Sequence, residues 1–421
     1  MSQTSSIPTA FHGSPGPLSL SVALDGAGWH PGAWRTPGAR AGELFTPAYW
    51  ADLVTLAERG LLDFVTIEDA LGVQSGDHLA TAGRETDQVR GRLDAALVAA
   101  FVAPLTRHIG LVPTVTTTHT EPFHVAKAIA TLDHNSKGRA GWRVQVSARS
   151  DEAAHFGRRE LPQLRREDLG TPTADRAVAE LFGEAADAVE AVRRLWDSWE
   201  DDAEIRDEST NRFVDRAKLH YVDFIGARFT VRGPSITPRS PQGQPIVAVL
   251  AHGRVPFALA ASSADVVFVT PHHADEARAI LARISAAEAE VSRTGAPLRI
   301  TADLLVVLDD TQAGADARLR DLNRLARAEP RSDALLVATT PAGLADLIEA
   351  WRHAGLLHGF RLRPAVLPDD LHAVVEGLVP ELQRRGLFRT GYGKQHLRER
   401  LGLPRPASRY AELVSPEREH A

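Results

Sequence analysis

Short apolar segments alternate with longer amphipathic segments along most of the chain. A short apolar run bounded by turn residues is typical of a buried strand, whereas apolar positions three and four residues apart predict a helix. The predicted strands span residues 19–24, 64–67, 109–116, 139–147, 245–250, 266–270, 298–308 and 359–363. The predicted helices span residues 47–59, 93–105, 121–133, 178–199, 273–293 and 341–353.

The order of these elements indicates how the strands pair. Strands and helices follow one another without consecutive hairpins, which favours a parallel sheet. The number of strand–helix units predicts an α/β fold of the (β/α)₈ barrel type, with a doubly wound open sheet as the alternative. Two polar segments, about 149–175 after the fourth strand and 201–244 before the fifth, are predicted insertions of the kind that often covers a barrel mouth.

The remaining segments define the domain limits. Residues 1–17 are rich in Ser, Pro and Gly and are expected to form a flexible leader. Residues 18–403 are predicted to form a single domain with a helical extension after Pro364. Residues 404–421 are expected to form a tail.

Composition narrows the class of protein. Of the 421 residues, 24% are charged and 43% hydrophobic, as in an ordinary globular protein. The formal net charge of −6 gives no reason to expect nucleic acid or a membrane surface as a partner. No apolar run of ~18 residues predicts a membrane span, and the first residues lack the pattern of a secretion signal. The absence of cysteine excludes disulfides, thiolate catalysis and Cys-bound metal, and we expect a cytoplasmic protein.

One segment carries a specific family resemblance. Residues 130–147 read ATLDHNSKGRAGWRVQVS. This resembles the pattern LDH-x-S-x-GR-x-GWN-x-VTS of flavin-dependent monooxygenases in the bacterial luciferase-like superfamily, in the branch that contains nitrilotriacetate and dibenzothiophene-sulfone monooxygenases. Further motifs similar to those of the family lie at 63–70, 232–245, 258–268 and 379–399, in the family's order. The resemblance therefore extends from about residue 18 to about residue 403.

The resemblance implies a (β/α)₈ fold and a two-component monooxygenase. Such an enzyme takes reduced FMN from a separate NAD(P)H:flavin reductase and uses O₂ to insert one oxygen atom into a small organic substrate. The superfamily also implies a homodimer or homotetramer. Two alternatives stay open. One is another flavin or deazaflavin oxidoreductase of the superfamily, and the other is a barrel that has lost flavin binding and acts as a binding or partner subunit.

Candidate site residues follow the predicted strands, because barrel active sites lie at the carboxyl ends of their strands. The resemblance implies that His30, in an aromatic loop after the first strand, hydrogen-bonds the oxygen adduct of the flavin or the substrate. It also implies flavin contacts at Asp69, Thr117 and Arg143. Without the family, Asp69 is equally well explained as a helix cap and Thr117 by local hydroxyl bonds.

A phosphate site is predicted after the fifth strand. There the backbone N–H groups at Gly253, together with His252 and Arg254, have the chemistry to hold a phosphate group. A loop that binds nothing is the alternative at this position.

Four departures from the family pattern concern these contacts. Arg143 stands where relatives usually have Asn, and Glu68 replaces a small residue. Residues 251–254 replace a Gly-Ser-Ser motif, and the His/Tyr pair of relatives is not found after Gly157. These departures favour the loss of flavin binding. A fixed positive charge at Arg143 would instead favour an anionic reduced flavin or bind an anionic substrate.

The remaining polar residues are expected to have structural roles. Asp133 and Arg139 are predicted to hold the turn between the third helix and the fourth strand. The histidine pairs 119/124 and 272/273 lack a matching carboxylate cluster, so no metal site is expected.

Overall fold

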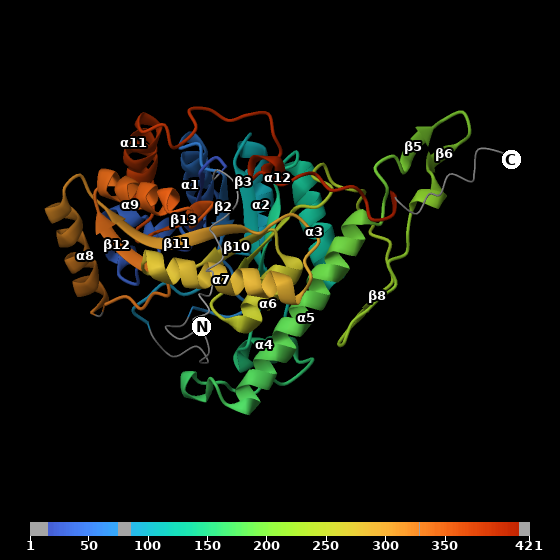
Figure 1. The fold of residues 1–421 in the computed structure, drawn as a ribbon, viewed down its shortest axis with the longest axis horizontal. Coiled ribbons are helices and arrows are strands. Elements are labelled where there is room, and N and C mark those ends of the chain that lie inside the picture. Colours follow the sequence, from blue (N-terminus) through green and yellow to red (C-terminus); the bar gives the residue numbers. More distant parts are fainter. Residues whose placement is uncertain (1–15, 75–85, 328, 412–421) are drawn as a thin grey trace, which may run out of the picture.

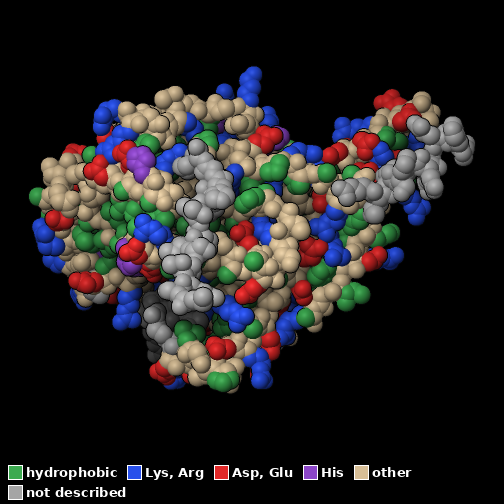
Figure 2. All heavy atoms as spheres, in the orientation of Figure 1, with side chains coloured by type: hydrophobic (Ala, Val, Ile, Leu, Met, Phe, Trp, Pro, Cys, Tyr) green, Lys and Arg blue, Asp and Glu red, His purple; other side chains and the backbone are tan. Residues whose placement is uncertain are grey.

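The computed structural model describes residues 16–74, 86–327 and 329–411. The expected leader, apart from its last two residues, and the last part of the expected tail lie outside the described residues. Within the described ranges, no helix is both long and apolar enough to cross a membrane. Basic and acidic side chains are interspersed over the face shown in Figure 2.

In the described part of the chain, eight parallel strands close into a barrel with helices packed around it (Figure 1). In order around the barrel they are β1 (Ser19–Leu24), β2 (Phe64–Ile67), β3 (Gly110–Thr116), β4 (Gly141–Gln145), β9 (Ile246–Leu250), β10 (Val266–Val269), β11 (Arg299–Leu308) and β13 (Gly359–Pro364). Strand β13 pairs with β1, with Phe360 opposite Leu20, which closes the ring. The predicted (β/α)₈ fold is confirmed, and each barrel strand coincides with a predicted strand.

Helices cover the outside of the barrel. They are α1 (Pro47–Arg59), α2 (Ala95–Val102), α3 (Pro122–Asn135), α6 (Arg254–Ser263), α7 (Ala274–Glu290), α9 (Pro341–His353), α10 (Asp369–Ala373) and α11 (Val379–Arg384). The limits of α1 and α9 are the predicted ones, because Thr46 and Thr340 cap their first turns and a proline follows each cap.

The structure has two elements between residues 309 and 340 that the sequence does not predict. Helix α8 (Gln312–Ala326) buries only Ala315 and Leu322, and its other residues are partly or fully exposed. Strand β12 (Leu335–Thr339) pairs with the carboxyl-terminal half of β11, beyond the part that pairs with β10. Its side chains are only half-buried, and its short apolar run, Leu335 to Ala338, is a strand signal that the predicted set of strands omits.

The predicted insertions form separate structures. The first contains α4 (Ser150–Phe156). The long helix α5 (Pro172–Asp197) follows it, begins at Pro172 rather than at 178, and packs on the barrel between α3 and α6. The segment before β9 contains two antiparallel pairs, β5 (Glu204–Asp207) with β6 (Arg212–Val214) and β7 (Phe224–Ile225) with β8 (Thr230–Val231). Figure 1 shows β5 and β6 extending away from the barrel, and α4 at the opposite end from α12 (Leu397–Arg400).

The interior of the barrel has an apolar layer near the start of the strands. It consists of Phe64, Val112, Ile246, Ala248, Val266 and Phe268. Leu397, Leu401 and Leu403 of the carboxyl-terminal segment pack against this layer. Because alternate strand residues face the interior, the next inward-facing residue of a strand lies two positions further along, closer to its carboxyl end. Those positions carry polar and charged side chains.

Asp133 and Arg139 hold the turn between α3 and β4, as predicted. The Asp133 carboxylate is fully buried and accepts hydrogen bonds from the backbone N–H of Ala140 and of Gln242 and from the Gln242 amide. The Arg139 guanidinium donates to the carbonyl groups of Ala103, Thr106 and Ile109. The segment with the most specific family resemblance therefore stabilises the connection between α3 and β4.

Replacing Asp133 with Ala is expected to lower the free energy of unfolding by about 2–5 kcal/mol, since two backbone N–H groups would be left buried without an acceptor. Urea titration followed by circular dichroism measures this change. The matched control is Asp310→Ala at an exposed position, expected within about 0.5 kcal/mol of the parent protein. Equal stability of the two variants would contradict this role of Asp133.

Candidate active site

An ionic network occupies the barrel above the apolar layer. Its buried cations are Arg143 on β4 and Arg361 and Arg363 on β13, and its buried anions are Glu68 and Asp303. The exposed Asp333, in the loop before β12, pairs with Arg363 at the edge of the network. Arg361 and Asp303 are direct neighbours across β11 and β13, with an N–O distance of 2.5 Å. The Arg361 guanidinium also lies over the Phe268 ring, 3.9 Å from its centroid, so the network rests on the apolar layer.

Arg143 and Glu68 form an ion pair in this network. Arg143 Nη1 lies 2.8 Å from Glu68 Oε2, and each side chain is 8% exposed. The same nitrogen donates to the Thr114 hydroxyl and to the Gln145 amide oxygen. Arg143 Nε is buried and has no hydrogen-bond partner among the described residues. Two departures from the family pattern are therefore one paired exchange, in which each residue neutralises the other.

The charges of the network are mutually supported. Burial alone would raise the pKa of the Glu68 carboxyl, but the Arg143 and Arg361 guanidinium groups outweigh burial and hold that pKa below its usual value. The pKa of Asp303 is lowered in the same way, against burial, by Arg361 and Arg363. Both carboxyls are therefore ionised at neutral pH, and three guanidinium groups face three carboxylates.

The network reaches the predicted phosphate site through His252. Arg363 Nη1 lies 2.6 Å from Asp333 Oδ1, and Asp333 Oδ2 lies 3.3 Å from His252 Nε2. Burial lowers the pKa of His252, so its ring is neutral at neutral pH. Gly253 and Arg254 follow directly, at the start of α6.

The start of α6 has the form of an anion site. Helix α6 has no side-chain cap at Gly253, so its first backbone N–H groups are not used by a capping side chain. A Cβ built on Gly253 would meet no atom within 4 Å, which leaves the approach open. Arg254 is exposed on the first turn. The structure thus brings His252, Gly253 and Arg254 together at the carboxyl end of β9.

His30 is buried, and both of its ring nitrogens are engaged. Nδ1 accepts from the Gly32 backbone N–H at 3.0 Å, which leaves the proton on Nε2. Nε2 then donates to the Asn323 amide oxygen on α8, also at 3.0 Å. Burial lowers the pKa of His30. The imidazole is therefore a neutral N–H donor rather than a base.

Asp69 and Thr117 make structural contacts at the ends of β2 and β3. Asp69 accepts from the backbone N–H of Ala70 and of Ala95, and so ties β2 to the first turn of α2. Burial raises the pKa of Asp69 to about 6. The Thr117 hydroxyl donates to the Gln145 carbonyl at 3.1 Å. Asp94, not Asp69, is the N-cap of α2, and the Thr117 hydroxyl bonds the neighbouring strand β4 rather than a local group.

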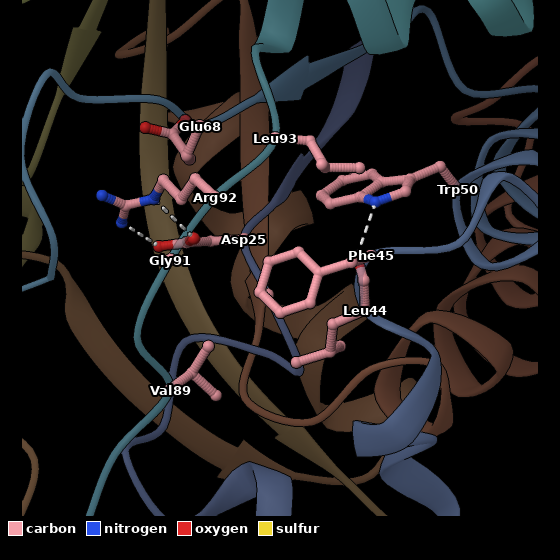
Figure 3. Close-up of a pocket in the computed structure, with 10 residues that line it drawn as sticks. Asp25, Leu44, Phe45, Trp50, Glu68, Val89, Gly91, Arg92 and Leu93 are labelled. Atoms are coloured by element: carbon pink, nitrogen blue, oxygen red, sulfur yellow. Dashed lines mark hydrogen bonds and ion pairs between the residues drawn. The ribbon is translucent and has the colours of Figure 1, made fainter. Parts of the chain in front are cut away.

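A small pocket opens beside Glu68 (Figure 3). Its walls are mostly apolar and come from Leu44, Phe45, Trp50, Val89 and Leu93. At one side Arg92 pairs with Asp25 at 2.9 Å. The pocket therefore has mostly apolar walls and borders the charged interior of the barrel at Glu68.

Sequence reasoning missed most of this network. Asp303, Asp333, Arg361 and Arg363 are neither predicted site residues nor named departures. The available signal is Arg361 and Arg363 at every second position of an otherwise apolar strand, which aims both side chains into the barrel. The histidines considered for metal have other contacts: His273 caps α7 and His119 stacks on Phe156.

Comparison with known proteins decides the family. Residues 27–357 match the family described as luciferase-like monooxygenase. The chain belongs to the luciferase-like monooxygenase family.

Individual members of this family match almost end to end. Nitrilotriacetate monooxygenase component A of Aminobacter aminovorans is 29% identical, over 94% of this chain and 98% of that protein. Dibenzothiophene-sulfone monooxygenase of Rhodococcus erythropolis is 31% identical, over 89% and 94%. The solved structure of riboflavin lyase with modified FMN and riboflavin has a TM-score of 0.76 at 25% identity, over 94% and 98%. These matches confirm the branch and the expected enzyme class.

The paired exchange predicts how this luciferase-like monooxygenase responds to substitution. Glu68→Ala alone is expected to lower the free energy of unfolding by about 3–5 kcal/mol, because it leaves Arg143 buried without its counter-ion. Arg143→Asn alone leaves Glu68 partly uncompensated and is also destabilising. The double variant restores the family residues and is expected to be more stable than either single variant. Urea unfolding of all four proteins gives the coupling energy, and simple additivity would contradict the pairing.

Proposed function

We propose that the protein is a two-component monooxygenase that uses reduced FMN and O₂ to oxygenate a small organic substrate. The observation that carries this proposal is the unpartnered Nε–H of Arg143, which is buried at the ionic layer of the barrel. A buried donor without an acceptor costs free energy, and an oxygen or nitrogen acceptor of a flavin ring would satisfy it. Family membership and the FMN in the riboflavin lyase structure support the same assignment.

The residues at the start of α6 would hold the FMN phosphate. The uncapped backbone N–H groups near Gly253 and the positive end of the helix favour an anion there. The Arg254 guanidinium would add a charge-assisted hydrogen bond. The departure from Gly-Ser-Ser therefore replaces hydroxyl donors by a cation rather than removing the site.

The ion pair with Glu68 determines what Arg143 would contribute to flavin binding. Because Glu68 neutralises it, Arg143 brings a directed hydrogen bond without a net positive charge. As independent residues, Arg143 and Glu68 would each obstruct a flavin. As a pair they do so less, since the ion pair keeps both side chains fixed.

When bound, reduced FMN would supply the reaction with O₂, and the chain would supply binding, orientation and exclusion of water. His30 would present its Nε2 proton to the substrate or to the reacting oxygen after exchanging its partner Asn323. A separate NAD(P)H:flavin reductase would deliver the cofactor, as the name "component A" of one relative suggests.

Titration with FMN and with anaerobically reduced FMN tests this function. Reduced FMN is expected to bind, and Arg254→Ala is expected to weaken FMN about tenfold while leaving riboflavin unchanged, because only FMN carries the phosphate. Flavin fluorescence and absorbance measure both. Arg320→Ala, at an exposed position of α8, is the control. If neither redox form binds at up to about 1 mM, the upper range of enzyme KM values, the proposal is wrong.

We propose a homodimer or homotetramer built through α2. Leu97, Phe101 and Leu105 lie four residues apart on one side of α2 and the turn that follows, and are 70%, 44% and 50% exposed. Exposed apolar residues in such a row are typical of an interface. A second copy of the chain would cover them.

Leu97→Glu combined with Phe101→Glu is expected to dissociate the oligomer, because two carboxylates would be buried in the interface. Light scattering coupled to size exclusion measures the mass. Phe213→Glu, at a 62% exposed position of β6, should leave the mass unchanged. Dissociation by the β6 variant and not by the α2 variant would place the interface elsewhere.

A further inference from the structure

A second cavity lies at the opposite end of the barrel from the candidate active site. Its volume is about 360 Å³. The first residues of β1, β2, β10 and β11 line one side of it, and the segment from Arg389 to Gly402 lines the other. Because all barrel strands are parallel, their starts lie at the end away from Arg143 and α6. The cavity is therefore separate from the proposed flavin site.

The walls of this cavity carry more positive than negative charge. Three arginines line it, Arg299, Arg389 and Arg400, against the carboxylates of Asp63 and Glu399. Both carboxylates already form other contacts. Asp63 accepts from the Leu20 backbone N–H and pairs with Arg389, and Glu399 accepts from the His396 backbone N–H.

Arg299 and Arg400 lack a counter-ion. Arg299 donates to the carbonyl of Gly402 at 2.6 Å, and Arg400 donates to the carbonyls of Asp63 and His108. Among the described residues, neither guanidinium forms an ion pair with a carboxylate. Burial lowers the pKa of both groups; for Arg299 burial acts alone, and for Arg400 it outweighs the nearby charge of Asp63.

Several N–H groups around the cavity are also unused. Arg299 Nε, Arg389 Nη1 and Arg400 Nε are buried without a hydrogen-bond partner in the described part of the chain. The three arginines that carry these atoms all line this cavity. Buried N–H groups are normally satisfied, so their clustering points to a missing acceptor.

We propose that this cavity binds a small, multiply charged anion with carboxylate or phosphate oxygens. Guanidinium groups bind such oxygens through paired, charge-assisted hydrogen bonds. A volume of about 360 Å³ is at the lower end of the range for ligand pockets, which limits the ligand to a small molecule. The anion would neutralise Arg299 and Arg400. The proposal does not depend on the proposed oxygenase function.

Calorimetric titration of the full chain with inorganic phosphate and with citrate tests this site. Chloride at equal ionic strength controls for screening. Saturable binding of at least one anion is expected, together with a melting temperature that rises with its concentration. Arg299→Gln should weaken the binding by about tenfold or more, whereas Arg320→Gln should leave it unchanged. Arg254→Gln should leave the Arg299-dependent binding unchanged, which separates this cavity from the start of α6.

A second variant tests the same inference by adding negative charge. A Cβ on Gly391, which lines the cavity, would meet no atom within 4 Å. Gly391→Asp is therefore expected to weaken anion binding by about tenfold while raising the melting temperature of the anion-free protein. Gly391→Asn, which has the same shape without the charge, should do neither.

Three results would overturn the inference. The first is no saturable binding of either anion at millimolar concentration. The second is binding that Arg254→Gln removes and Arg299→Gln does not. The third is equal stabilisation by chloride.

Discussion

A closed barrel holds little water, so each charge placed inside it must be neutralised by another charge. Three guanidinium groups and three carboxylates meet this constraint here, with Asp303 at the centre between Arg361 and Arg363. Opposite charges directly across two strands stabilise the pairing of those strands. The register of β11 against β13 and the position of Glu68 after β2 are therefore tied to the same network.

This constraint changes how departures from a family pattern are judged. Arg143 and Glu68 each look disruptive alone, because each would bury a charge. Together they form a pair 2.8 Å apart within a larger balanced set. An evolutionary path that introduces Arg143 first passes through a variant with an unpaired buried charge, which costs several kcal/mol (about 3–5). A path that introduces Glu68 first keeps that carboxylate paired with Arg361. Glu68 is thus expected in close relatives that carry Arg143.

The sequence predicts the architecture better than the site. The barrel strands are recognisable because each is a short apolar run between helices, and the Thr-Pro starts of α1 and α9 define their limits. Helix α8 escapes prediction because it buries only two side chains. The site depends on contacts between residues far apart in the chain, such as Arg361 with Glu68. Periodicity indicates that Arg361 faces inward, but no local pattern names its partner.

The closure of the barrel by β13 also has a consequence for how the molecule is made. Strand β1 finds its second neighbour only when Gly359 pairs with Ser19. Contacts of such long sequence separation form late and slow the folding of a chain. During synthesis, β1 and the strands that follow it form a sheet with an open edge, which is prone to pair with other chains. Arg361 and Arg363 lie on β13, the strand that covers this edge. Docking of β13 therefore neutralises the interior carboxylates in the same step that removes the open edge.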